Sequence, residues 1–245
     1  MSDNGYILAI EISNPGSAGH GAGSVAIGRL IGASVTHIDA EPVGAGGRGS
    51  GGFGGHDDDL MPAIERLCTR AGIHPRSGHL RRVGVSIGPG GYTSTRVACA
   101  AGKMIAEASG AECVAVPTAL AVLEAAQSTL RSGRVAVALA GKGETAWVQV
   151  FENGEPRAPG TVVDSLAAAP MFTSGVRVLI ADRHLPAPIR AAAESAGVRL
   201  VEPAFDAAAC ARVAARTTPI DPAELVPLYP REPDAVTLWR ARKKG

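Results

Sequence analysis

The segment from residue 82 to residue 109 constrains the fold more than any other part of the chain. A run rich in Val and Ile over 82–87 leads into the turn Gly-Pro-Gly-Gly at 88–91, and a helical pattern follows over 93–109. A strand that passes through a glycine turn into a helix is the building unit of α/β proteins. This segment therefore predicts an α/β fold.

The flanking sequence continues the alternation of strands and helices. Strands are expected over 6–12, 24–30, 33–38, 112–116, 134–139, 145–151, 176–181 and 198–202. Helices are expected over 57–71, 118–130, 186–196 and 205–216. This order predicts mixed sheets flanked by helices in two lobes. We assign 1–116 to the first lobe, with 219–245 packing back on it, and 117–218 to the second.

Composition and charge exclude several classes of protein. Hydrophobic residues make up 46% of the 245 residues, and 24 basic residues nearly balance 23 acidic ones. This balance argues against disorder and against a dedicated nucleic-acid-coating surface. The glycine-rich stretch 44–55 is expected to be a loop. A polar N-terminus without a basic start, and no apolar run of membrane-spanning length, are typical of a cytoplasmic protein. The cysteines at 68, 99, 113 and 210 form no C-x-x-C motif, so we expect reduced, mostly buried thiols.

The glycine turn is the strongest candidate for a binding site. Backbone N–H groups at a helix N-terminus can hold a phosphate or a carboxylate. The candidate contacts for an anion or nucleotide are Gly88, Gly90, Gly91, Thr93 and Arg96, together with Glu11 at the end of the first strand. The alternative is that the glycines only turn the chain and that Arg96 caps a partner surface. No G-K-[ST] follows the turn, so it is not a P-loop.

Other catalytic patterns are weak. Ser86 stands in a formal G-x-S-x-G match but falls inside the expected strand, where a nucleophile elbow would need a helix to start. His56 and the three aspartates after it are expected to form a charged helix start. His74 and His79 are separated by Pro75, so they cannot share one helical face. The residues therefore predict neither metal ligands nor a catalytic group.

Several ordered motifs resemble the TsaB (YeaZ) family. The family's first two strands resemble ILAIEIS at 7–13 and SVAIG at 24–28. Its GPGSFTGLR signature and the following A-K-G-L-A helix match Gly88, Pro89, Gly90, Thr93, Arg96 and residues 102–106. Weaker matches are His56, Leu60, Pro62 and Ile64, the hairpin at 140–147, and Pro227, Tyr229 and Arg231. The family's Asp-Thr pair after the first strand is Glu11-Ile12 here.

The resemblance implies an actin-like (ASKHA, ribonuclease H-like) fold and a role in tRNA threonylcarbamoyladenosine biosynthesis. It implies a non-catalytic subunit that pairs with TsaD, the subunit that transfers threonylcarbamoyl to the adenosine beside the anticodon, with the TsaE ATPase assisting. It implies no cofactor of its own, with ATP or ADP at the complex interface. The implied contacts with TsaD lie on two helices, at Leu60, Met61, Ile64, Ala98, Ala101 and Ile105.

Alternatives remain open at this stage. The same helix faces can simply pack on their own sheet, or they can form a homodimer when TsaD is scarce. A protein of this fold can also be an independent ASKHA-type small-molecule kinase or a glycoprotease-like hydrolase. The basic tail at 240–244 is a candidate contact for tRNA, although a terminal run of this length is typically solvated.

Overall fold

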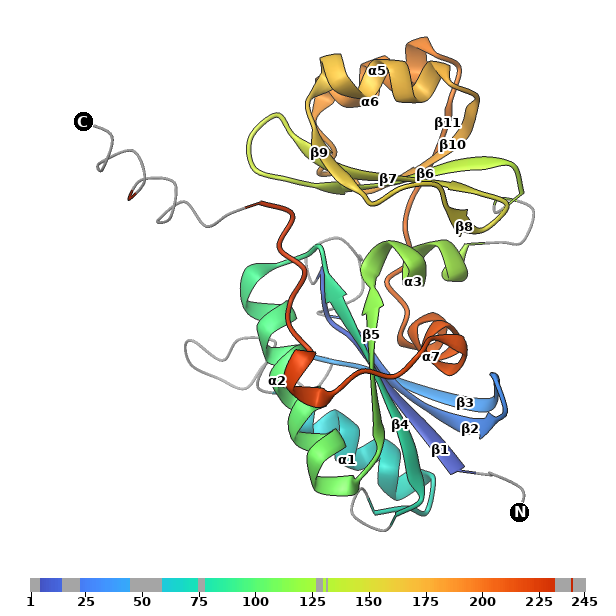
Figure 1. The fold of residues 1–245 in the computed structure, drawn as a ribbon, viewed down its shortest axis with the longest axis vertical. Coiled ribbons are helices and arrows are strands. Elements are labelled where there is room, and N and C mark those ends of the chain that lie inside the picture. The colour runs from blue at the N-terminus through green and yellow to red at the C-terminus, as the bar shows by residue number, and fades with distance from the viewer. Residues whose placement is uncertain are drawn as a thin grey trace.

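The computed structural model describes residues 5–14, 23–44, 59–74, 78–126, 130, 132–231 and 239. These residues form two α/β lobes, each built on its own sheet (Figure 1). The described part of the chain contains no helix that is both long and apolar enough to cross a membrane.

The first sheet has the strand order β3-β2-β1-β4-β5. Its strands are β1 (Gly5–Glu11), β2 (Ser24–Ile31), β3 (Ser34–Pro42), β4 (Leu80–Gly88) and β5 (Glu112–Pro117). β2 is antiparallel to both of its neighbours, whereas β4 and β5 run parallel to β1. This mixed order is the one expected for a ribonuclease H-like, actin-like lobe, and it confirms the predicted α/β class.

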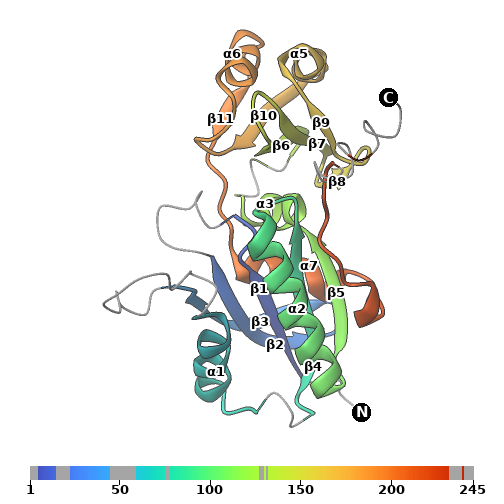
Figure 2. The same cartoon turned by 90° about the vertical axis from the view of Figure 1, so that its left-hand side faces the viewer.

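Helices cover both faces of the first sheet (Figure 2). α1 (Leu60–Arg70) and α2 (Tyr92–Ser109) lie on one face, and α7 (Ala207–Arg216) lies on the other. Because successive side chains of a strand point to opposite faces, Leu8 and Ile10 pack toward α1 and α2 while Ile7 packs toward α7. Gly102 lets α2 approach β4, since a Cβ there would collide with Val85.

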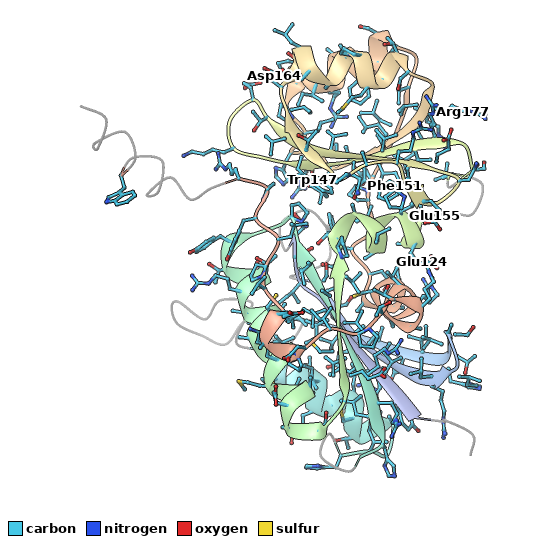
Figure 3. The ribbon with its side chains drawn as sticks, in the orientation of Figure 1. Glu124, Trp147, Phe151, Glu155, Asp164 and Arg177 are labelled. Carbon is cyan, nitrogen blue, oxygen red and sulfur yellow. The ribbon has the colours of Figure 1, made fainter. Side chains whose placement is uncertain are left out.

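The second sheet has the order β11-β10-β6-β7-β8, with β9 paired to β7. Its strands are β6 (Arg134–Ala140), β7 (Ala146–Glu152), β8 (Glu155–Pro156), β9 (Thr161–Val163), β10 (Val176–Ala181) and β11 (Arg199–Val201). α5 (Ser165–Thr173) and α6 (Ala187–Ser195) cover one face. Trp147 and Phe151 lie on the opposite face, toward α3 (Thr118–Ala125), as Figure 3 shows.

α3 joins the two lobes. Its apolar side chains pack on the second sheet, and Ala121 packs in the core that α7 shares with the first sheet. Glu124 also pairs with Arg212 and Arg216 of α7, at 3.3 and 2.8 Å. The range 117–218 that we assigned to the second lobe includes α7, but the structure packs this helix against the first sheet. The cause is its face of small side chains, which fits closely on β1 and β4.

After α7, the chain continues along the first lobe as a strap, defined here as residues 219–231. It includes the short 3₁₀ helix Pro222–Glu224 and runs beside α2 (Figure 1). Ile220 N–H donates to the Cys113 carbonyl at 2.8 Å, and Leu228 N–H donates to the Ile87 carbonyl at 2.8 Å. Lys103 Nζ donates to the Ala223 carbonyl at 2.9 Å. The strap is thus fixed along most of its length.

Some element boundaries differ from those predicted. α3 ends at Ala125 rather than at residue 130, whereas α1 is described from Leu60 and its predicted start at residue 57 lies outside the described residues. The sequence patterns did not predict α5, β8 or β9. All four cysteines are free and buried, as expected, and burial raises the pKa of Cys99 to about 11. His56, the rest of the glycine-rich stretch after Gly44, and the basic tail lie outside the described residues.

Candidate functional site

The loop after β1 closes over the glycine turn between β4 and α2. Gly91 N–H donates to the Ser13 carbonyl at 2.6 Å, and Asn14 Nδ2 donates to the Pro89 carbonyl at 3.3 Å. Gly90 is required here, because a Cβ at this position would collide with the Ser13 carbonyl. The Gly91 N–H, on which the predicted anion site depended, is therefore already used in a hydrogen bond within the chain.

Glu11 lies beneath this loop as a buried carboxyl group. Its Oε1 accepts hydrogen bonds from Ser13 N–H at 2.8 Å and from Ser13 Oγ at 2.6 Å. Its Oε2 is buried without a hydrogen-bond partner. Burial raises the pKa of Glu11 and Asp206 adds slightly to the rise, whereas the hydroxyls of Ser13 and Ser86 and the Ser13 N–H offset only part of it. Burial therefore favours the protonated form of Glu11.

The predicted anion contacts do not surround one open site. Gly88, Gly90 and Gly91 form the closed turn, whereas Thr93 and Arg96 are exposed on the first turns of α2. Arg96 turns to Tyr92, to whose hydroxyl it donates at 3.0 Å. Glu11 is wholly buried. The order of strands and turns places these residues at one end of the sheet. The sequence patterns did not predict that the loop after β1 fills the glycine turn.

The weaker catalytic patterns find no support in the structure. Ser86 is buried within β4, and its hydroxyl pairs with that of Thr118 at 2.8 Å. It therefore has no exposed position from which to attack a substrate. Within the described ranges, no three His, Cys, Asp or Glu side chains lie close enough together to hold a metal ion.

Five of the six side chains expected at the partner interface are buried in the chain's own core: Leu60, Ile64, Ala98, Ala101 and Ile105. Only Met61 is available, with 47% of its surface exposed. The correction has a simple cause. The apolar periodicity of an amphipathic helix marks the face that covers its own sheet, and both helices use that face in this way.

The surface of α2 presents other apolar side chains that the prediction missed. Met104 is 63% exposed, and Ala100, one helical turn earlier, is also exposed. The available signal was a large apolar residue on the side of the helix opposite its periodic face. With Met61 on α1, these residues lie on helices that cover the same face of the first sheet (Figure 2).

An aromatic cluster stands where the strap meets the start of α2. The rings of Tyr92 and Tyr229 lie 5.6 Å apart between centroids, tilted by 30°. The guanidinium carbon of Arg96 lies 5.1 Å from the Tyr92 ring centroid. Tyr92 is 61% exposed and Tyr229 43% exposed. Large rings held together at a surface in this way need an explanation other than core packing.

Comparison with known proteins gives a family and a fold. Residues 54–198, more than half of the chain, match the family described as TsaD, tRNA N6-adenosine threonylcarbamoyltransferase. A crystal structure described as an uncharacterized protein with similarity to peptidase YEAZ from Pseudomonas aeruginosa is 16% identical and superposes with a TM-score of 0.64; the match covers 93% of this chain and 100% of that one. YeaZ from Pseudomonas aeruginosa is 15% identical, with a TM-score of 0.60 and coverage of 92% and 99%. No curated protein sequence matches this chain.

Proposed function

The chain belongs to the family described as TsaD, tRNA N6-adenosine threonylcarbamoyltransferase, and from this premise we propose that it is a non-catalytic subunit of a tRNA-modifying complex. Together with the YeaZ fold, this match confirms the resemblance to the TsaB (YeaZ) family. In the proposed complex the chain pairs with a TsaD-type catalytic subunit, which transfers threonylcarbamoyl to the adenosine beside the anticodon of tRNA, and a TsaE-type ATPase assists.

The closed glycine turn is the observation that carries this proposal. The N–H groups of this turn, at the start of α2, could receive a phosphate only if they were free, yet Gly91 N–H is bound to the Ser13 carbonyl. The carboxyl group of nearby Glu11 is buried. Among the described residues, its hydrogen bonds come from Ser13 and not from a cationic side chain. A carboxyl group in this state favours neither a phosphate nor a metal that would bridge to one. The proposed subunit therefore binds no nucleotide on its own, and ATP or ADP binds where the subunits meet.

The exposed surface of α1 and α2 supplies the proposed contact with the catalytic subunit. We define the docking face as Met61, Ala100 and Met104. Methionine side chains are flexible and polarizable, so they adapt to the surface of a partner. Small residues such as Ala100 allow a helix of the partner to approach closely. The docking face replaces the buried residues that the motifs first suggested.

The direct test is co-expression of the chain with the TsaD-type protein of the same organism. We expect the two to elute together in size-exclusion chromatography, and we expect threonylcarbamoyl transfer to tRNA to be lost when this chain is omitted. Separate elution with unchanged modification would contradict the proposal. Calorimetry with ATP and magnesium should show no binding to the chain alone; measurable binding would favour the independent kinase.

A single substitution tests the docking face. We expect Met104→Glu to weaken the complex at least about 10-fold, because it replaces an exposed apolar anchor with a charge that the partner must desolvate. The matched control is Leu166→Glu on α5, which changes an 84% exposed apolar side chain in the other lobe. Affinity measured by surface plasmon resonance should fall for the first variant and stay unchanged for the second. If Met104→Glu and Leu166→Glu bind the catalytic subunit with equal affinity, Met104 does not belong to the contact surface.

A further inference from the structure

We propose that Tyr92, Arg96 and Tyr229 form a platform on which an unpaired base of RNA stacks. This inference rests on the proposed function, because tRNA is the RNA that the complex would meet. It adds a direct contact between this chain and the nucleic acid. In the following paragraphs these three residues are called the stacking platform.

The stacking platform is built by tertiary structure rather than by a local sequence motif. Tyr92 and Arg96 belong to the first turns of α2, whereas Tyr229 belongs to the strap, more than 130 residues further along the chain. The hydrogen bond from Leu228 N–H to the Ile87 carbonyl, 2.8 Å long, fixes the strap beside the turn that starts α2. The Tyr229 ring is thus held next to Tyr92 before any ligand arrives, so little ordering entropy remains to be lost on binding.

The exposed surfaces of the platform have the chemistry that binds bases. Unpaired bases in RNA loops stack on aromatic rings and on the plane of a guanidinium group. Tyr92 is 61% exposed and Tyr229 is 43% exposed, so both residues are open to solvent. Arg96 lies over the Tyr92 ring and is hydrogen bonded to its hydroxyl, which keeps the guanidinium close to the ring.

The charge around the platform favours an RNA ligand over an acidic one. The turn and first turns of α2, residues 88–100, and the strap residues 225–231 contain no Asp or Glu, although Glu224 and Glu232 flank the strap segment. They contain Arg96 and Arg231, both of which are exposed. Cations beside stacking rings can bind the phosphates that flank a stacked base. Because the chain has a net charge of only +1, this local excess is a property of the site and not of the whole surface.

The platform is separate from the main anchor of the docking face. Tyr92 and Met104 lie 12 residues apart on one continuous helix. At a rise of about 1.5 Å per residue, this separation is about 18 Å along the helix axis. Arg96 lies one helical turn before Ala100, so the platform adjoins the docking face, and Tyr92 lies at the end of it that is farthest from Met104. Variants in the two places should consequently have different effects.

The experiment measures binding of an RNA hairpin with an unpaired purine-rich loop, by fluorescence anisotropy, to the complex with the catalytic subunit. We expect Tyr92→Ala and Tyr229→Ala each to weaken binding about 10-fold, and Tyr92→Phe and Tyr229→Phe to keep it, because the ring stacks and the hydroxyl does not. Arg96→Ala should weaken binding more than Arg29→Ala. The latter removes the same charge from the other cation–π pair, in which Arg29 lies 4.9 Å from the Tyr6 ring centroid. A fully paired duplex should bind equally to all variants.

The outcomes separate this proposal from the proposed function. If the alanine variants form the complex normally but bind the hairpin as tightly as the wild type, the platform is not an RNA site, while the subunit role is untouched. If they lose the complex itself, the cluster is a contact with the protein partner, and the RNA proposal is overturned. If wild-type complex does not bind the hairpin, the RNA proposal is also overturned. If no complex forms even with the wild type, the proposed function fails first.

Discussion

The Ala101→Arg variant is expected to unfold, whereas Ala100→Arg, one position earlier on α2, is expected to fold normally and to lose the catalytic partner. Ala101 is 7% exposed and packs in the core between α2 and the first sheet. An arginine there overfills the core and buries an unpaired charge, and together these effects cost about 5 kcal/mol. The total stability of a typical domain is roughly 5–15 kcal/mol. Little or no folded protein should therefore remain.

Ala100 provides the matched comparison, because the same substitution on the same helix meets solvent there. Arginine is almost as good a helix former as alanine, so the free energy of unfolding should change by less than about 0.5 kcal/mol. Thermal denaturation followed by circular dichroism measures both variants. A folded Ala101→Arg protein would show that α2 can rotate or that the strap yields. A folded Ala100→Arg protein that still binds its partner would remove Ala100 from the docking face.

The contrast between these two alanines shows how far sequence patterns reach. The periodicity of α2 and its glycine turn gave the helix, its ends and its apolar face, because these depend on local spacing. Periodicity could not separate a face that packs on the chain's own sheet from one that awaits a partner. The motif residues Ala98 and Ala101 were therefore assigned to an interface, although they lie in the core. Met104 lies on the opposite side of α2, and a large apolar residue at such a position was the better indication of the proposed docking face.

The elements and contacts that escaped prediction have physical causes as well. α5 has almost no amphipathic periodicity, and Pro170 stands within it, so its sequence does not resemble a surface helix. The closure of the glycine turn by Ser13 and the meeting of Tyr92 with Tyr229 join residues that are distant in sequence. Such contacts depend on the packing of whole elements. The first-sheet strands, by contrast, are marked by local runs of Val, Ile and Leu.

Glu11 should make the protein less stable as the pH rises, which is opposite to the behaviour of a carboxylate in an ion pair. Burial raises its pKa above the ordinary value of 4.5, so the folded state holds the proton more tightly than the unfolded state does. Below pH 4.5 both states are protonated, and the full stability is present. As the pH rises further, only the unfolded state releases the proton. Stability then falls by up to about 1.4 kcal/mol per pH unit until the pH exceeds the folded-state pKa.

The Glu11→Gln variant isolates this effect. Glutamine keeps an oxygen that can accept the hydrogen bonds from Ser13 and resembles the protonated acid, so no proton is released on unfolding. We expect the variant to match the wild type near pH 4.5 and to be more stable than the wild type at pH 8, in urea denaturation curves measured across this range. Glu65→Gln on the exposed side of α1 is the control and should leave the pH dependence unchanged. If wild type and Glu11→Gln have the same pH dependence, Glu11 is ionised in the folded protein, and burial does not raise its pKa.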